Sequence, residues 1–310
     1  MSSMARGERP RTLVGTLYCG ENEFEALKES LQAQTYSHWE HVVYKNLPNK
    51  EAHDRLYRTF MDQQDDFDLF LKLDADMVFR SSEGLRRIVD LFQGTDELDH
   101  LTFAVRDWYS DSLIEGLHTF SDRAFWPERK ESRFVDSSPD VPGRHLKLWG
   151  GPAPVVDHSP DPSPFQAFRF GVHRALKVVQ PGRWKLRYGQ TRGQWKLLQR
   201  CWRHFVSEGD HRLGLAILGA DVTLAGDVRP KHYDEVQEPL QGIFQDYENV
   251  SAQHLYTRLS EYWDSEMRSR MRYLYRVGPV RLTASALYHL AYTTKNRLLN
   301  SEGNTPILKS

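Results

Sequence analysis

The sequence is poor in cysteine, lacks long apolar runs and has no excess of charge of either sign. Its two cysteines, Cys19 and Cys201, are too few for a disulfide framework or a cysteine-rich zinc site. No apolar run approaches the roughly 18 residues that span a bilayer. With 41 basic and 42 acidic residues the net charge is −1, which argues against a globally basic nucleic-acid-binding protein.

The amino terminus is polar and basic up to Arg11, and no apolar segment follows it, so we predict no signal peptide. The scarcity of cysteine suits a reducing compartment. We therefore expect a cytoplasmic protein, which either stays in solution or lies at the inner face of a membrane.

Apolar spacing in the first hundred residues alternates between strand and helix patterns. Strands are expected at 12–17, 41–44 and 67–73, and the last is almost continuously apolar, as a strand buried on both faces should be. Helical spacing covers 23–34 and 52–61. These successive strand–helix units predict an α/β fold with a Rossmann-like, mostly parallel sheet flanked by helices.

The rest of the chain is less regular. Residues 108–165 are rich in proline, aspartate, serine and aromatic residues, which indicates long binding loops with short strands. The other elements expected are strands at 101–105 and 222–225 and helices at 192–206, 211–218, 251–276 and 281–299. Gly278-Pro279 separates the last two helices, and a carboxyl-terminal helical region, 241–310, is expected.

Two carboxylates follow the third expected strand, in Asp74-Ala75-Asp76. Burying two unpaired carboxylates beside an apolar strand is costly, so a cation or water must surround them. Mg²⁺ and Mn²⁺ prefer oxygen ligands and often bridge protein carboxylates to substrate phosphates. The pair therefore indicates either a divalent-cation site or a solvated strand end.

Four stretches occur in a particular order between about residues 12 and 235. They are Thr16-Leu17-Tyr18 with Leu27, Ser30-Leu31 and Gln34-Thr35-Tyr36; Trp39-Glu40 before the strand 41–44; Asp74-Ala75-Asp76; and Glu208-Gly209-Asp210 before a helix expected to end at Gly219, then a strand, a turn and His232. Together they resemble the family-2 nucleotide-sugar glycosyltransferases of the A-type fold (GT-A).

The resemblance implies an inverting, metal-dependent transfer of a sugar from a nucleoside diphosphate sugar to a hydroxyl group. The acceptor would be a glycan or a lipid-linked molecule, as in the synthesis of cell-surface polysaccharides. A catalytic domain over residues 1–240 is implied, in which about 12–105 bind the nucleotide sugar and about 106–240 hold the acceptor and the catalytic acid.

Roles for single residues follow from the same resemblance. Mn²⁺ or Mg²⁺ would be held by Asp74, Asp76 and His232 and would neutralise the leaving diphosphate. Glu208 or Asp210 would take the acceptor's proton as general base, and the register counted from Gly219 favours Glu208. The residues expected to contact the nucleotide sugar are Tyr18, Glu21, Asn46, Asp74 and Arg169.

The sequence departs from the family pattern at three places. Lys45-Asn46 stands where the family has adjacent aspartates, Cys19 replaces an asparagine, and Gly209 separates the two acids of the catalytic motif. These departures do not determine which nucleotide is bound. They also allow two other classes of protein. One is a nucleotidyltransferase, against which the acidic loop 18–23 argues, and the other is a non-catalytic glycan- or nucleotide-binding protein with a degenerate site.

Three further features each allow two interpretations. His158 is either a rival metal ligand to His232 or an ordinary loop histidine. A group of aromatic residues is either a platform for an acceptor sugar or core packing: Trp108, Tyr109, Trp126 and Trp149.

The segment 267–301 has basic but no acidic residues, interleaved with aromatic ones. It is either an amphipathic surface for peripheral contact with an anionic membrane or a packed helical region with a solvated basic face.

Overall fold

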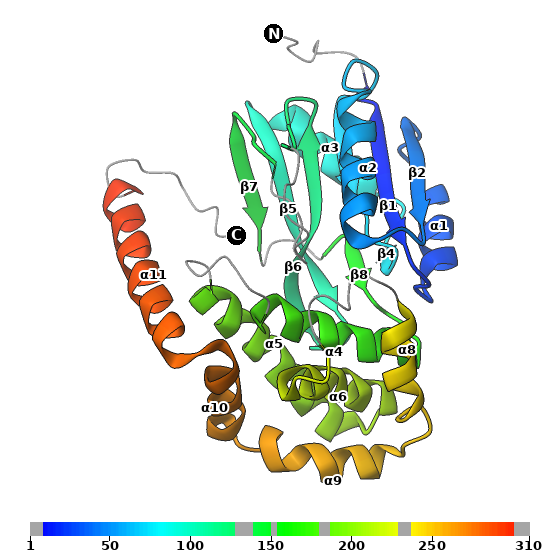
Figure 1. Ribbon diagram of the computed structural model, residues 1–310. Coiled ribbons are helices and arrows are strands. Elements are labelled where there is room, and N and C mark those ends of the chain that lie inside the picture. Colours follow the sequence, from blue (N-terminus) through cyan, green and yellow to red (C-terminus); the bar gives the residue numbers. More distant parts are fainter. Residues whose placement is uncertain (1–8, 128–138, 150–153, 180–186, 229–236, 301–310) are drawn as a thin grey trace. The chain divides into compact units, whose positions relative to one another are not determined.

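The computed structural model describes residues 9–127, 139–149, 154–179, 187–228 and 237–300 (Figure 1). The chain divides into two compact units, residues 1–163 and 164–310, and each is described by itself. This division does not test the predicted catalytic domain of residues 1–240 or the helical region 241–310, which stay predictions.

The first unit is an α/β unit built on one sheet. Within its described residues, eight strands pair in the order β2-β1-β3-β6-β5-β8-β4, with β7 beside β5. The elements are β1 (Thr12–Tyr18), α1 (Phe24–Gln32), β2 (Trp39–Lys45), α2 (Asn49–Met61), β3 (Leu69–Lys72), β4 (Met77–Phe79), α3 (Gly84–Gly94), β5 (Leu98–Asp107), β6 (Ser112–Ser121), β7 (Arg144–Leu148) and β8 (Val156–His158).

The α/β class is confirmed, but the sheet is mixed rather than mostly parallel. β1 runs parallel to β2 and β3, whereas β6 is antiparallel to both β3 and β5. β8 in turn is parallel to β5 and antiparallel to β4. The segment expected to be irregular contains the ten-residue strand β6, which follows β5 after a short connection and therefore pairs with it as a hairpin.

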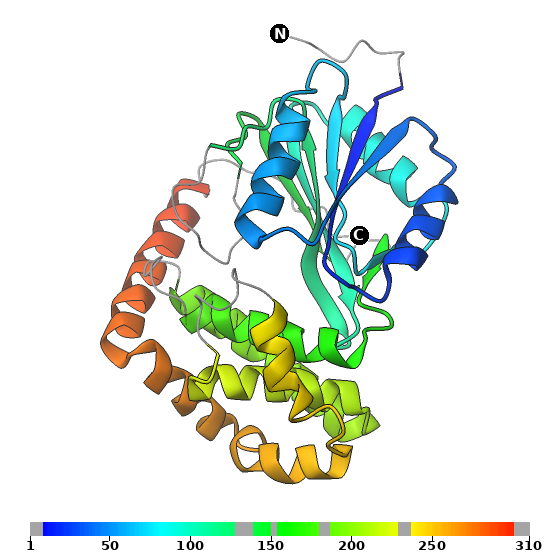
Figure 2. The same ribbon diagram turned by 45° about the vertical axis from the view of Figure 1, so that its right-hand side comes forward.

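Helices cover both faces of this sheet (Figure 2). α1 and α3 pack on one face, where Leu71 of β3 is buried among their apolar side chains. α2 packs on the other face around Phe70, together with Phe60 and Trp126. Successive residues of β3 point to opposite faces, and both faces are buried, which explains the continuous apolar run in the sequence.

In its described residues the second unit is entirely helical. Its helices are α4 (Pro164–Val179), α5 (Arg187–Glu208), α6 (His211–Ala225), α8 (Gln237–Gln245), α9 (Ala252–Trp263), α10 (Glu266–Val277) and α11 (Pro279–Asn300). The expected helix 251–276 is interrupted at Asp264 and Ser265, because the Ser265 hydroxyl accepts the Arg268 N–H and caps a new helix. No helix in the described ranges is long and apolar enough to cross a membrane.

The strand predicted at 222–225 is wrong, and so is the helix end predicted at Gly219. Both lie inside α6, which is buried on almost every side. A Cβ atom on Gly219 would lie 2.0 Å from the carbonyl oxygen of Phe168 in α4. Glycine at this position therefore allows α6 to approach α4 closely and does not end the helix. The β-branched residues after it continue the buried helix.

Candidate functional site

Three parallel strands bring their carboxyl ends to one edge of the sheet. Tyr18 at the end of β1 lies in register with Lys45 at the end of β2. The backbone N–H of Asn46 donates to the Tyr18 carbonyl oxygen at 2.9 Å, and Asn46 has a φ of 54°. Asp74 follows β3, the other neighbour of β1. The predicted residues Tyr18, Asn46 and Asp74 therefore meet at the edge where open α/β sheets bind ligands.

An amine lies over two aromatic rings at this edge. The Tyr18 and Phe24 ring centroids are 4.4 Å apart, and Lys45 Nζ lies 5.7 Å from the first and 5.2 Å from the second. Lys45, which stands where the family pattern has an aspartate, therefore changes the charge at this edge of the sheet. It places a positive charge at the carboxyl end of β2, where the resemblance expects two acids.

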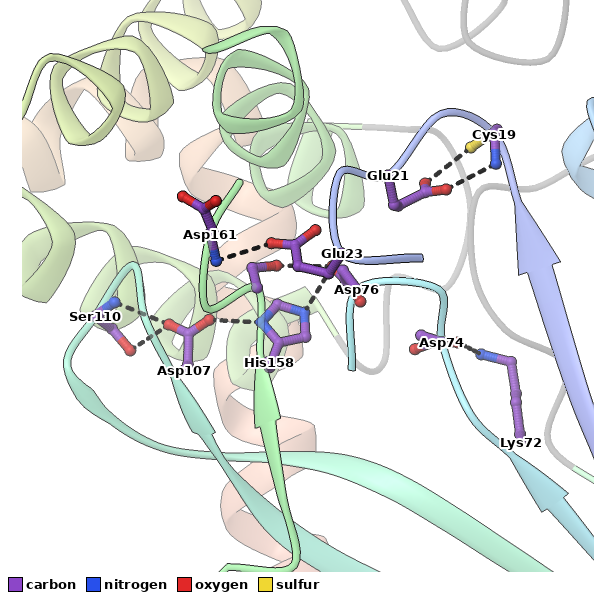
Figure 3. Close-up of polar contacts among 11 residues, drawn as sticks. Cys19, Glu21, Glu23, Lys72, Asp74, Asp76, Asp107, Ser110, His158 and Asp161 are labelled. Atoms are coloured by element: carbon purple, nitrogen blue, oxygen red, sulfur yellow. Dashed lines mark hydrogen bonds and ion pairs between the residues drawn. The ribbon is translucent and has the colours of Figure 1, made fainter. Parts of the chain in front are cut away.

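Glu21 shapes the loop after β1. Its carboxylate accepts the Cys19 backbone N–H at 2.7 Å, and its other oxygen lies 3.1 Å from Cys19 Sγ (Figure 3). The predicted role of Glu21 in binding a nucleotide sugar stays a prediction, since these contacts are within its own loop. They fold the loop tightly around the end of β1.

Asp74 forms an ion pair with Lys72, two residues earlier. Lys72 Nζ lies 2.7 Å from Asp74 Oδ1, and the lysine side chain is only 10% exposed, whereas that of Asp74 is 41% exposed. Because side chains alternate along β3, Lys72 lies on the same face as Phe70, where α2 packs. Its amine reaches Asp74 after the end of the strand (Figure 3). The sequence analysis missed Lys72, although a lysine in an otherwise apolar strand is a usable signal.

Asp76 lies beside a strand that is distant in sequence. Ser159 donates its hydroxyl to Asp76 Oδ2 at 2.8 Å and its backbone N–H to the Asp76 carbonyl oxygen at 2.7 Å. His158 Nε2 lies 3.4 Å from the same Oδ2. The rival histidine of the sequence analysis is thus adjacent to the second aspartate of the motif.

Behind His158 lies a fully buried carboxylate. His158 Nδ1 and Asp107 Oδ1 form a hydrogen bond 2.8 Å long, and Asp107 Oδ2 accepts the backbone N–H and the hydroxyl of Ser110. Asp107, His158 and Asp76 thus form a row whose members come from β5, β8 and the loop before β4 (Figure 3). Asp107 was not predicted, because it follows the expected strand 101–105 as a single carboxylate, without the second one that marks Asp74 and Asp76.

Two loops are tied together next to this row. Asp161 donates its backbone N–H to Glu23 Oε1 at 3.1 Å, and Asn22 donates its side-chain amide to the Asp161 carbonyl oxygen at 2.8 Å. The segment after β8 is therefore held against the start of α1. This contact fixes the position of the residues that flank His158 and the loop after β1.

The predicted catalytic acids lie in the second unit and differ in their environment. Glu208 is the exposed last residue of α5, with Ser207 as a hydrogen-bond partner. Asp210 caps α6 by accepting the Arg212 N–H, and it also pairs with the Arg212 guanidinium at 2.9 Å. Burial alone would raise the pKa of Asp210, but the hydrogen bonds and positive charge of Arg212 outweigh it and lower that pKa.

The other predicted ligands are less defined. Arg169 is a half-buried residue of α4. His232 lies outside the described residues. Within the part of the chain that the structure describes, no group of three or more histidine, cysteine, aspartate or glutamate side chains is arranged to hold a metal ion. Any cation at Asp76 would therefore need ligands from water, from a substrate or from residues outside that part.

Two of the four aromatic residues considered as a sugar platform are core residues instead. Tyr109 is fully buried, and Trp126 stacks on Tyr57 with ring centroids 4.6 Å apart. Trp149 is exposed, and Trp108 packs edge-on against Tyr109. Packing is therefore the interpretation that fits Tyr109 and Trp126.

The helix α10 has one apolar face exposed and another face buried. Met267, Met271 and Tyr275 recur every four residues and are all exposed, whereas Ser269, Tyr273 and Val277 recur in the same way and are buried. α11 continues the exposed apolar surface with Val280, Leu287 and Leu290. A contiguous exposed apolar surface of this kind is typical of a site that contacts a partner or a membrane.

A scan against models of known protein families gives no match for this chain. A search of curated proteins for similar sequences gives none either.

Proposed function

We propose that this protein is an inverting, metal-dependent glycosyltransferase of the GT-A type that uses a nucleoside diphosphate sugar as donor. The observation that carries the proposal is the position of Asp74 and Asp76 directly after β3, beside Tyr18 and Asn46 at the carboxyl edge of three parallel strands. Carboxylates at this edge suit a divalent cation and a diphosphate.

The two aspartates would have different tasks. Asp74 is neutralised in part by Lys72, so it suits a hydrogen bond to a ribose hydroxyl or to a metal-bound water. Asp76 would hold Mn²⁺ or Mg²⁺, and the resemblance adds His232 as a further ligand. Such a cation would supply Lewis-acid neutralisation of the leaving diphosphate.

The reaction would be a single displacement at the anomeric carbon. A carboxylate takes the proton of the acceptor hydroxyl, the acceptor oxygen bonds to the anomeric carbon, and the bond to the diphosphate oxygen breaks on the opposite face. Glu208 suits this base better than Asp210. The Asp210 carboxylate is occupied by Arg212 and by capping α6, and its lowered pKa makes it a weaker proton acceptor.

The test is release of nucleoside diphosphate from a panel of nucleotide sugars, measured for the whole protein with Mn²⁺, with Mg²⁺ and with EDTA. We expect turnover with at least one donor, which EDTA abolishes and Asp76→Asn lowers by at least about 100-fold. Asp65→Asn, at an exposed position after α2, is the matched control and should keep full activity.

Two outcomes would replace the proposal. Release of pyrophosphate from a nucleoside triphosphate and a sugar phosphate would favour the nucleotidyltransferase. Metal-dependent binding of nucleotide sugars without turnover of any donor or acceptor would favour the non-catalytic binding protein.

A peripheral contact with membrane, on the cytoplasmic side, is part of the same proposal and would suit a lipid-linked acceptor. Segment 267–301 carries seven basic and no acidic residues; since the whole chain has a net charge of −1, the remainder has −8. On α10, Arg268 and Arg270 flank the exposed row of Met267, Met271 and Tyr275. This pattern suits an anionic lipid surface, whereas two copies meeting through this face would bring like charges together.

A further inference from the structure

The two units of the chain carry opposite charges. Residues 1–163 contain 19 basic and 29 acidic residues, a net charge of −10, whereas residues 164–310 contain 22 and 13, a net charge of +9. The strongest imbalance lies at 164–207, where ten lysine and arginine residues occur without one acidic residue. Such asymmetry along a chain is typical of a protein that binds an anionic partner through its basic part.

Four of these basic residues are exposed and form one row on α5, the α5 row: Arg192, Lys196, Arg200 and Arg203. Their spacings of four, four and three residues keep them within an arc of about 80° on the helix and spread them over about 17 Å along its axis. Another face of α5 packs on α10, where Trp195 Nε1 and the Gln199 amide both donate to the Ser269 hydroxyl. The α5 row is therefore the side of this helix that is open to a partner.

Other helices of the protein balance their exposed charges. In α2 and α10, residues four apart form ion pairs, Lys50–Asp54 and Glu266–Arg270. In the α5 row, residues one turn apart have the same charge, and such pairs destabilise a helix. Within the described part of the chain, no acidic side chain forms an ion pair with Arg192 or Arg203, the two ends of the row. A row that repels itself in this way favours a ligand that neutralises it.

The surroundings of the α5 row distinguish between classes of polyanion. A single-stranded nucleic acid stacks its bases on exposed aromatic rings, but Trp195 and Trp202, which lie between the residues of the row, are buried. A helix that lies on a membrane inserts apolar side chains beside its basic ones, but Leu197 and Leu198 are buried as well. The α5 row therefore suits a linear polyanion that has neither bases nor acyl chains.

We infer that the α5 row binds a linear anionic glycan whose units carry carboxylate, phosphate or sulfate groups. Neighbouring charges four residues apart in the row are about 6 Å apart along the axis, which is similar to the length of one sugar residue. Three of the four side chains are arginines, whose guanidinium groups pair with carboxylate and phosphate through two parallel hydrogen bonds. This glycan is the acceptor of the transfer, and that role, unlike the binding itself, rests on the proposed function.

The first test measures the Kd of the whole protein for labelled oligosaccharides by fluorescence anisotropy. Oligogalacturonate and a heparin oligosaccharide are the anionic probes, and a maltooligosaccharide of equal length is the neutral one. We expect at least one anionic probe to bind at least about tenfold more tightly than the neutral one, with an affinity that falls as salt is added. Equal affinity for all three probes would overturn the inference, and so would tighter binding of oligothymidylate than of either anionic probe.

The second test compares two variants of equal charge. Lys196→Gln with Arg203→Gln should raise the Kd for the anionic probe at least about tenfold. Arg55→Gln with Arg58→Gln removes the same charge from exposed positions of α2 and should change the Kd less than about twofold. Equal effects of the two double variants would mean that only net charge matters and would refute the α5 row. A greater loss of binding to phosphatidylserine-containing vesicles than to the anionic probe would assign the row to a membrane instead.

Lys196→Glu separates loss of binding from loss of folding. The glutamate would lie one turn from Arg192 and one turn from Arg200, so it replaces repulsion by attraction along the helix. We expect the midpoint of thermal unfolding to rise while the affinity for the anionic probe falls at least about tenfold. A variant that is more stable but binds the probe as tightly as the wild type does would contradict the inference.

These outcomes are distinct from those of the proposed function. A protein that binds the anionic probe through the α5 row but transfers no sugar keeps the binding surface and rejects the reaction. A protein that transfers sugar to a neutral acceptor, with a kcat/KM that Lys196→Gln with Arg203→Gln leaves unchanged, keeps the reaction and rejects the α5 row as the acceptor site.

Discussion

Gly171 of α4 and Gly219 of α6 are each in contact with the backbone of the other helix. A Cβ on Gly171 would lie 1.7 Å from the Ala216 carbonyl oxygen, and one on Gly219 would lie 2.0 Å from that of Phe168. The obstacle in both cases is backbone, which cannot rotate away as a side chain can. The packing of α4 on α6 therefore requires glycine at both positions.

Gly219→Ala should lower the free energy of unfolding by at least about 2 kcal/mol, because the helices must separate to admit the methyl group. Chemical denaturation followed by circular dichroism measures the change. Gly193→Ala is the matched control, since nothing lies within 4 Å of its Cβ position on α5. It should leave stability unchanged or raise it by up to about 1 kcal/mol. Equal effects of the two changes would contradict the close approach.

The histidine cluster on β5, β6 and β7 should make the first unit sensitive to acid. His100 Nε2 lies 3.1 Å from His118 Nδ1, and the His145 ring stacks on His100 at 3.8 Å. Burial, followed by the charges of His145, His118 and Lys147, lowers the pKa of His100 to about 3. Because the folded pKa is depressed, this group's contribution to stability is complete above about pH 6.5, the ordinary histidine pKa, and is lost as the pH falls from there towards 3.

His100→Phe removes this titration and keeps a ring beside Phe120. The loss of stability between pH 7.5 and pH 5, measured by urea denaturation, should be smaller in the variant than in the wild type by on the order of 1 kcal/mol, after allowing for partial exposure. His145 and His41 also have lowered pKa values and stay in both proteins, so part of the sensitivity remains. Identical losses in the two proteins would rule out His100 as a source.

The ion pair between Lys72 and Asp74 can be measured by a double-mutant cycle of Lys72→Met and Asp74→Asn. We expect a coupling energy of about 0.5 to 1 kcal/mol, since the lysine is buried but the aspartate is reached by water. The pair Arg106–Asp111, which is exposed on both sides, is the reference and should give a coupling near zero. A coupling no larger than this reference would mean that the pair does not order Asp74.

Contact with a membrane should depend on the exposed row of α10. Co-sedimentation with vesicles should show binding to phosphatidylserine-containing vesicles, weakened by salt, and much less to neutral ones. Met271→Asp with Tyr275→Asp should weaken it at least about tenfold. Val206→Asp, at an exposed apolar position of α5, is the control. Point substitutions are preferable to removing residues 241–310, because Leu259 and Trp263 of that region are buried. If the double variant binds the vesicles as well as the wild type does, the segment 267–301 is better interpreted as a packed helical region with a solvated basic face.

The first part of the fold could be predicted because its signals are local. The helix α1 has its buried residues at the spacing of an amphipathic helix, and β3 is apolar throughout because both of its faces are covered. The aspartates after β3 were found for the same reason, since a strand end is visible in the sequence.

The rest depended on contacts between distant residues. The short connection to β5 makes β6 antiparallel to it, but the pairing of β6 with β3 joins segments that are distant in sequence, and no local pattern encodes it. The residues 222–225 favour a strand by composition but are buried in α6, where tertiary packing outweighs propensity. Asp107 and His158 are 51 residues apart in sequence and meet only because β8 pairs with β5.

The strand β8 is only three residues long, yet it pairs with β4 and β5 at once. Side chains alternate along a strand, so a slip of one residue would turn the imidazole away and present Asp157, which now lies near Arg80, in its place. Lengthening the chain before this strand is thus tolerable in evolution or engineering only if the pairing is kept. What has to be kept is the register of β8 with β4 and β5, whereas the amino-acid composition of the segment before β8 can change.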